Sequence, residues 1–146
     1  MFQRLIETSP TWITVPLRLA LGVVFIAHGA QKVFGAWEGP GLAKFTAFPA
    51  PLGMQPSWLW MGAAAFAELV GGILVLTGLL TRVGAALIGF VMLVAILGPH
   101  WGKFFANNQG MEYAFSLLGI ALALLIAGGG QASADRALMG PRGRRR

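Results

Sequence analysis

The sequence predicts an all-α integral membrane protein, a bundle of four transmembrane helices with both termini in the cytoplasm. The first observation is composition: hydrophobic residues make up 56% of the 146-residue chain and charged residues only 11%, whereas a soluble domain carries about 25% charged residues. The second is a set of four apolar segments, which fill most of the chain at about residues 15–34, 59–80, 83–99 and 111–127. The chain has too few charged residues to form the surface of a soluble protein. The four segments fill so much of it that no soluble core is left in which they could be buried.

The residues before the first apolar segment, MFQRLIETSPTWI, predict a short helix at the membrane interface. Its apolar face would hold Phe2, Leu5 and Ile6. The segment is not typical of a signal peptide, because the polar stretch ETSPT precedes the apolar run and no small-residue cleavage site follows at the right place. We therefore expect these residues to lie on the membrane surface.

The first two apolar segments are long enough to cross a bilayer, which takes about 20 residues. The first, 15–34, carries Pro16 in its first turn, where the missing N–H of proline costs nothing. Arg18 also lies near that end, and we expect its long side chain to reach the aqueous interface. The second segment, 59–80, holds one charged residue, Glu68.

The third and fourth segments lie near the lower length limit of about 17 residues for a span. The sequence GPH ends the third segment, and GGG ends the fourth. Segments of this length are also compatible with buried helices of a soluble protein. The connection 36–57 contains GPG and FPAP and is long for a helix connection. Two interpretations of it stay open: a short lid or re-entrant piece over the outer end of the bundle, or a flexible amphipathic connector.

The distribution of basic residues predicts the orientation. With four spans, the side opposite the termini holds only Lys32, Lys44 and Lys103, whereas the side of the termini collects every arginine: Arg4, Arg18, Arg82, Arg136, Arg142, Arg144, Arg145 and Arg146. The positive-inside rule therefore places both termini in the cytoplasm. We expect a transmembrane domain over residues 1–135 and a basic cytoplasmic tail over 136–146. On a membrane chain, such a tail is better interpreted as an anchor at anionic lipid than as a nucleic-acid-binding segment.

The residue inventory excludes several kinds of chemistry. The chain contains no cysteine, so disulfides, thiolate metal sites, cysteine-held iron–sulfur clusters and thiol exchange are excluded. It has no H-E-x-x-H or E-x-x-H motif, and His28 and His100 lie at different depths, which is unsuited to a bis-histidine haem. We expect no metal and no covalent cofactor, so a redox role would need a bound molecule or a partner.

Both histidines, Lys32, Glu68 and Glu112 lie within the apolar segments or at their outer end. At about 1.5 Å per helical residue, His28 lies about 4 to 5 Å outward of the bilayer midplane, Lys32 about 10 Å outward, and Glu68 almost at the midplane. His100 and Glu112 lie at the outer end. These depths predict that Glu68 pairs with His28, and that Glu112 pairs with Lys32 or His100.

Two interpretations of this polar set stay open. A charge at the bilayer centre costs about 2.5–3.5 kcal/mol, so Glu68 must be paired, protonated or next to water. Hydrogen bonds between helices would satisfy that need and hold the bundle together. A polar pocket that opens outward would satisfy it as well, because His28 and Lys32 are four residues apart on one helix face, with Gln31 beside them. The cost of burying Glu68 favours the pocket as a working hypothesis.

A series of ordered motifs runs through about residues 15–135. It begins with RLALGVVFIAHGAQKVFG and continues with GPG, FPAP, AELVGGILVLTGLLTRVGA and VMLVAI. His100 then precedes an aromatic pair, Phe104 and Phe105, and EYAFSLLGIALALLIAGGG follows. Through these motifs the chain resembles the DoxX family of small bacterial membrane proteins, and only the basic tail falls outside the resemblance.

The resemblance implies a four-helix bundle, multi-pass in the bacterial cytoplasmic (inner) membrane. Its relatives include the quinone-reducing membrane subunit of thiosulfate oxidation and membrane-bound oxidoreductase assemblies linked to thiol and oxidative stress, while many members have no known activity. The family-like positions fall largely in the outer half of the bundle, at His28, Gly29, Lys32, Gly35, Glu68, Gly71, Gly72, His100, Glu112 and Tyr113.

Three functions stay open. The first is a redox-linked membrane subunit with a quinone-type pocket, for which the apolar walls would be Phe25, Phe34, Phe66 and Trp37, and the polar candidates are His28, Gln31, Lys32, Glu68, His100, Glu112 and Tyr113. Such a subunit needs a partner oxidoreductase or a soluble electron donor, so whether the chain is an enzyme stays open. The second is a non-enzymatic scaffold or assembly factor for a partner oxidoreductase, and the third is a pathway for small solutes or protons. Self-association into a homo-oligomer is compatible with each.

Overall fold

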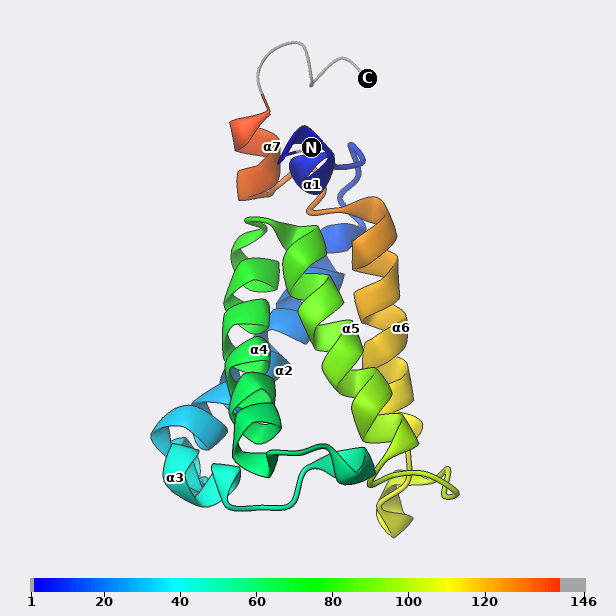
Figure 1. The fold of residues 1–146 in the computed structure, drawn as a ribbon. Helices are drawn as coiled ribbons and strands as arrows, with labels where there is room; N and C mark the ends of the chain where they lie inside the picture. The colour runs from blue at the N-terminus through cyan, green and yellow to red at the C-terminus, as the bar shows by residue number, and fades with distance from the viewer. Residues whose placement is uncertain (1, 140–146) are drawn as a thin grey trace.

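The computed structural model describes residues 2–139, without the side chains of Phe2 and Arg4, and within that range it contains helices and no strands. The all-α prediction is confirmed. Four long helices run alongside one another (Figure 1): α2 (Thr14–Phe34), α4 (Ser57–Thr77), α5 (Thr81–Leu97) and α6 (Glu112–Ala127). Helices α2 and α4, with 21 residues each, are long and apolar enough to cross a membrane, and α5 and α6 are shorter apolar helices of 17 and 16 residues.

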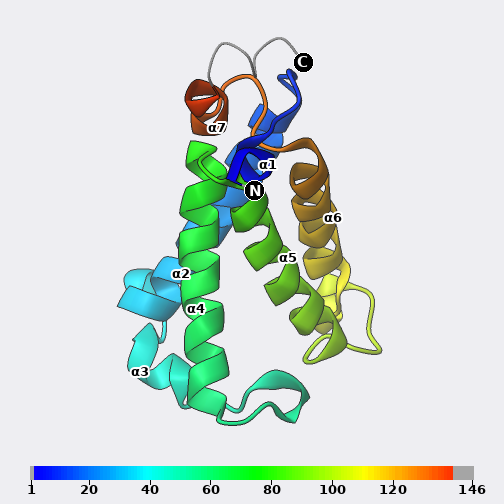
Figure 2. The same cartoon turned by 45° about the horizontal axis from the view of Figure 1, so that its top comes forward.

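Short elements gather at the two ends of this arrangement. Helices α1 (Phe2–Ile6) and α7 (Ala134–Leu138) lie together at one end, which we call the terminal end (Figures 1 and 2). The opposite end, which we call the loop end, carries α3 (Gly41–Thr46) and three single 3₁₀ turns: η1 (Ala36–Glu38), η2 (Pro51–Gly53) and η3 (Ala106–Asn108). The basic tail predicted from residue 136 onward falls mostly outside the described residues.

The long helices coincide with the four predicted apolar segments to within three residues at each end. Glycine sets two of the ends. Gly35 after α2 and Gly78 after α4 adopt left-handed conformations, with φ of 73° and 71°, and their N–H groups return to carbonyls of the last helical turn. Glycine adopts this conformation without steric cost, so α4 ends at Thr77 rather than at the predicted residue 80.

Helices α2 and α4 pack with their backbones almost in contact. A Cβ placed on Gly29 of α2 would lie 2.5 Å from the backbone nitrogen of Leu69, and one placed on Gly72 of α4 would lie 2.7 Å from that of Ile26. Small residues allow this close approach between helices in lipid, where packing replaces the hydrophobic effect as the main source of association. This close contact fixes the level at which side chains of α2 meet those of α4.

We expect Gly29→Ala to lower the free energy of unfolding by about 1–3 kcal/mol, because the added methyl group forces the two backbones apart. The matched control is Gly119→Ala in the interior of α6, where an added Cβ meets nothing within 4 Å. That change should be neutral or stabilise the helix by about 0.5–1 kcal/mol. Thermal melting in detergent micelles measures the difference in stability between the two variants. Equal melting temperatures would contradict the close packing of α2 against α4.

At the terminal end, Arg18 joins the helices instead of reaching the aqueous interface as predicted. Its side chain is only 6% exposed. The guanidinium donates hydrogen bonds to carbonyl oxygens of two segments far away in the sequence: Val75 (2.9 Å), Leu76 (2.8 Å), Gly129 (3.0 Å) and Ala132 (2.6 Å). The first two belong to the last turn of α4, where carbonyls lack helical partners and attract a cation. The snorkelling prediction was therefore wrong.

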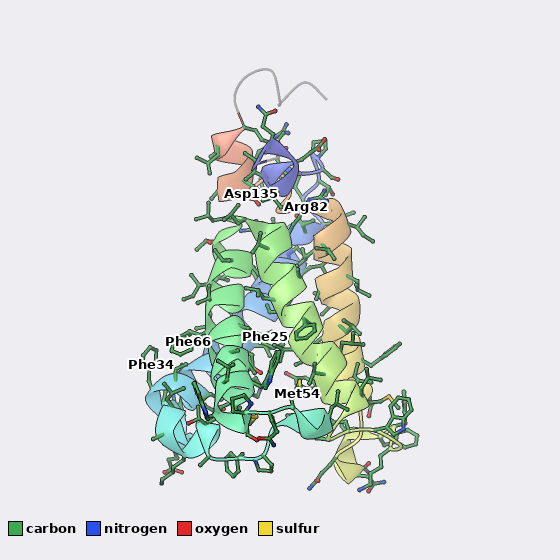
Figure 3. All side chains as sticks on the ribbon, viewed as in Figure 1. Phe25, Phe34, Met54, Phe66, Arg82 and Asp135 are labelled. Carbon is green, nitrogen blue, oxygen red and sulfur yellow. The ribbon has the colours of Figure 1, made fainter. Side chains whose placement is uncertain are left out.

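Asp135 in α7 completes this end by capping the start of α5. Its carboxylate accepts hydrogen bonds from the backbone N–H of Leu80 (2.6 Å) and from the N–H (2.9 Å) and hydroxyl (2.8 Å) of Thr81. Figure 3 shows Asp135 at the terminal end, with Arg82 nearby. Of the apolar face predicted for α1, Ile6 is buried and Leu5 is 39% exposed, while the side chain of Phe2 is outside the described residues.

Candidate functional site

A cavity of about 760 Å³ lies between the long helices in their loop-end half. All four long helices contribute to its wall, and the two loop-end connections contribute Phe45, Pro51, Met54, Ala106, Gln109 and Gly110. Most of the lining is apolar, and Figure 3 shows Phe25 and Met54 in this half of the molecule. A cavity of several hundred cubic ångströms with a few convergent polar groups is the usual form of a small-molecule site.

The first polar group of the cavity is an ion pair between α2 and α4. The ammonium of Lys32 contacts both carboxylate oxygens of Glu68, with Nζ 2.5 Å from Oε1. Glu68 is only 3% exposed, whereas the Lys32 side chain keeps 22% of its surface accessible. The Lys32 ammonium also lies 5.2 Å from the centre of the Phe45 ring, a cation–π arrangement supplied by α3. The buried carboxylate is thereby neutralised beside an accessible ammonium.

His28 lies one helical turn from Lys32 on the same face of α2, and it also lines the cavity. Among residues 2–139 the structure gives its ring no hydrogen-bond partner, and the side chain is exposed. The imidazole therefore has a nitrogen free to donate to a ligand. This combination, a charge pair and an unengaged imidazole on one wall, is the most polar feature of the cavity.

A second polar group faces the cavity from the far side, where α5 and α6 meet the loop end. His100 Nδ1 lies 2.7 Å from the carbonyl oxygen of Gln109, which fixes the ring orientation. Because a carbonyl only accepts, Nδ1 carries the proton in this hydrogen bond. Tyr113 in the first turn of α6 lines the cavity next to this pair. Polar groups thus stand on two different walls.

The pairings predicted from depth were wrong. Glu68 pairs with Lys32, not with His28, and Glu112 accepts a hydrogen bond from the backbone N–H of Ala106 at 2.9 Å instead of binding Lys32 or His100. The reason is side-chain direction, since side chains in a helix lean toward its N-terminus. Helices α2 and α4 run in opposite directions, so Lys32 leans inward and Glu68 leans outward until they meet.

Of the predicted polar candidates, five line the cavity: His28, Lys32, Glu68, His100 and Tyr113. Two do not. Gln31 lies on the side of α2 that faces the first connection, where its backbone and Cβ touch Gly39. Glu112 is engaged in the η3 turn as described above. Whether the five lining residues bind a ligand stays a prediction.

The predicted apolar walls fared less well than the polar residues. Phe25 is 1% exposed and lines the cavity, but Phe34, Trp37 and Phe66 point away from it, with exposed fractions of 73%, 70% and 47%. Figure 3 shows Phe34 and Phe66 on the outside of the molecule. Their aromatic character marked them as candidates, yet the helical face on which they lie is turned toward the surroundings.

Sequence reasoning missed several lining residues. Methionines are the clearest case, because Met54, Met61 and Met92 all line the cavity, and unbranched thioether side chains adapt to irregular ligands. Phe45 was missed as the ring beside Lys32, and Gln109 as the partner of His100. The GPG and FPAP motifs were the available signal, since they flag a structured connection that returns over the loop end.

Comparisons with known proteins identify the relatives of the chain. The DoxX family model matches residues 13–101, which span α2 to the end of α5. The chain is 34% identical over 111 residues to a Bacillus subtilis (strain 168) protein named "Putative oxidoreductase CatD", covering 76% of this chain and 77% of that protein. It is 31% identical over 147 residues to "Uncharacterized membrane protein Rv3486" of Mycobacterium tuberculosis (strain ATCC 25618 / H37Rv), covering 92% and 86%. No solved structure matches the chain significantly. The chain therefore belongs to the DoxX family of membrane proteins.

Proposed function

We propose that α2, α4, α5 and α6 cross the bacterial cytoplasmic membrane as a four-helix bundle that binds a quinone in its loop-end cavity and serves as a redox-linked membrane subunit. Both termini would lie in the cytoplasm, because Arg18, Arg82 and Arg136 gather at the terminal end. Exposed aromatic side chains support the opposite boundary at the loop end, where Trp58 is 63% and Trp101 is 65% exposed.

One observation carries the quinone proposal: an apolar cavity holds the Lys32–Glu68 ion pair and the unengaged ring of His28 on one wall. A quinone is a flat apolar ring with two opposed carbonyl oxygens, both hydrogen-bond acceptors. Lys32 and His28 supply donors on the α2 wall, and Tyr113 supplies a hydroxyl on the α6 wall. Polar groups on two walls match a ligand with two opposed acceptors better than they match a ligand with one polar end.

The residues around the cavity suit proton handling as well as binding. A bound quinone supplies the redox chemistry, which takes up two electrons and two protons. Lys32 and His28 would orient one carbonyl and hold a proton beside it, with Glu68 keeping the ammonium in place. The chain has no cysteine and no electron carrier of its own, so the electrons must come from a partner oxidoreductase or a soluble donor. The oxidoreductase name of the Bacillus subtilis relative agrees with such a role.

Binding of a short-chain benzoquinone tests the proposal. We expect the purified chain to be protected thermally by the quinone, and His28→Ala to weaken binding about tenfold, which corresponds to the loss of one hydrogen bond. The matched control is Gln31→Ala, on the same helix but outside the cavity, and it should bind as the wild type does. Absence of protection, together with His28→Ala behaving like the wild type, would contradict the quinone site and favour a scaffold role.

A further inference from the structure

We propose that the cavity opens sideways into the bilayer between α4 and α5, so that its ligand is a quinone with a long hydrocarbon chain that passes out through this opening. The inference rests on the proposed function for the identity of the ring. The existence and direction of the opening rest on geometry alone. A quinone of this class stays embedded in the membrane, and it enters the cavity from the bilayer.

The two helices touch at one end of the opening and diverge from there. A Cβ placed on Gly84 of α5 would lie 2.8 Å from the carbonyl oxygen of Gly71 in α4, so the backbones meet at that level. Toward the loop end the facing side chains of α4 are alanines, Ala67, Ala64 and Ala63, and they line the cavity. Figures 1 and 2 both show α4 and α5 separating toward the loop end.

The connection between α3 and α4 closes the other end of the opening. Its η2 turn reaches across to the C-terminus of α5, where a Cβ placed on Gly98 would lie 2.8 Å from Cβ of Pro51. Figure 1 shows this segment crossing below the gap between α4 and α5. The gap is therefore framed on all sides by protein, and it faces the flank of the bundle rather than its end.

Exposed lining residues on both sides of the gap support an opening there. Trp60, Ala63 and Phe90 all line the cavity, yet all are exposed, Trp60 by 39% and Phe90 by 58%. Other exposed lining residues lie on α2 and at the loop end, but these three stand on the two helices that flank the gap, as an opening between α4 and α5 requires. From Ala67 to Trp60 the rim runs about 10 Å along α4, at about 1.5 Å per residue.

The chemistry of the rim fits a hydrocarbon chain. Tryptophan, alanine and phenylalanine side chains form it, and in a spanning bundle it faces the acyl chains of lipid. A ring held at Lys32 can then leave its chain in the bilayer. Entry from the aqueous end would instead expose the chain to water, which is unfavourable in proportion to its apolar area.

Spin labelling tests the direction of the opening. The chain has no cysteine, so Ala63→Cys at the rim carries a single nitroxide, and Ala86→Cys, an exposed position of α5 outside the cavity lining, is the matched control. In lipid nanodiscs we expect the label at 63 to be more accessible to oxygen than to a water-soluble nickel complex. Decyl-benzoquinone should lower that oxygen accessibility at least twofold, and the same ring without the chain should not. The label at 86 should respond to neither.

Narrowing the opening gives an independent readout. The wild type should bind decyl-benzoquinone at least tenfold more tightly than the chain-free ring, after correction for partition into the bilayer. Ala63→Trp and Phe90→Trp, one from each side of the opening, should reduce that ratio at least threefold, and Ala86→Trp should leave it unchanged. Two variants from different helices guard against a failure of one to fold.

The outcomes separate the two proposals. Failure of the chain-free ring to bind would contradict the quinone site itself. The side opening would be overturned if decyl-benzoquinone bound no more tightly than the chain-free ring. It would also be overturned if the ratio of these two affinities were unchanged in both Ala63→Trp and Phe90→Trp. A label at 63 that is more accessible to nickel than to oxygen would overturn it too. If phospholipid chains alone protected the label and decyl-benzoquinone had no effect, the hydrocarbon chain of a quinone would not occupy the opening.

Discussion

Replacing Arg18 with methionine is expected to lower the free energy of unfolding by about 3–5 kcal/mol, because the change removes at once every hydrogen bond that this buried guanidinium donates. The guanidinium donates to four carbonyl oxygens, and hydrogen bonds to charged groups contribute about 1.5–3 kcal/mol each before non-additivity is counted. Methionine keeps much of the apolar length of the side chain, so lost donors rather than lost packing dominate the effect. Unfolding in mixed micelles of rising dodecyl sulfate content, followed by circular dichroism, measures it.

Arg82→Met is the matched control for this variant. Arg82 also donates to carbonyl oxygens at the terminal end, those of Glu7 (3.1 Å) and Ile126 (2.9 Å), but these hydrogen bonds lie in an exposed setting. Water replaces exposed hydrogen bonds at little cost, so we expect a loss below about 1 kcal/mol. If the two variants unfolded at the same detergent composition, Arg18 would not be the residue that joins α4 to the segment after α6.

Replacing Lys32 with methionine should have a comparable effect, a loss of about 3–5 kcal/mol, because it leaves the carboxylate of Glu68 buried without its cation. Glu68 is 3% exposed, so water does not replace the ammonium. Lys44→Met is the control, since Lys44 is an exposed lysine at the same loop end and makes no ion pair within residues 2–139. The same micellar unfolding measurement compares them.

The double variant Lys32→Met/Glu68→Leu separates stability from binding. Replacing both members of a buried ion pair with apolar residues of similar size is often neutral, so we expect stability within about 1 kcal/mol of the wild type. Quinone affinity should nevertheless fall at least tenfold, because the donor on the α2 wall is gone. A double variant that is stable and still binds quinone as the wild type does would show that the pair only holds α2 against α4.

The helices could be predicted from the sequence because lipid imposes a simple requirement. A backbone in hydrocarbon must satisfy its own hydrogen bonds, so long apolar runs become helices, and Gly35 and Gly78 mark ends in the usual way. The polar residues of the site could be predicted for a related reason. Ionisable side chains such as Lys32 and Glu68 are too costly in lipid to stand there without a partner.

The partners of these residues could not be predicted, because depth along a helix says nothing about side-chain direction. The backbones of Lys32 and Glu68 lie at different depths. Their side chains meet because α2 and α4 run in opposite directions, so the two side chains lean toward each other. Arg18 illustrates a second limit. Its acceptors are backbone carbonyls up to 114 residues away in the sequence, and every residue has a carbonyl, so no residue type marks them.

Aromatic residues show a third limit. Phe25 and Phe66 look alike in the sequence, both within long apolar helices, yet one is 1% exposed and the other 47%. In a soluble helix, polar residues mark the outward face, but a helix that faces lipid is apolar on all sides. The apolar walls of the cavity therefore needed the structure, whereas five of its polar residues were predicted from the sequence.

Identification of the molecule that occupies the cavity tests whether this chain binds a membrane quinone. The protein would be extracted from its native membrane in a mild detergent and examined by native mass spectrometry and by density in the loop-end half. We expect one quinone per protein chain, with its ring beside Lys32 and its hydrocarbon chain between α4 and α5, and loss of that mass in Lys32→Met/Glu68→Leu. A cavity closed by side chains with no bound molecule would contradict the quinone site.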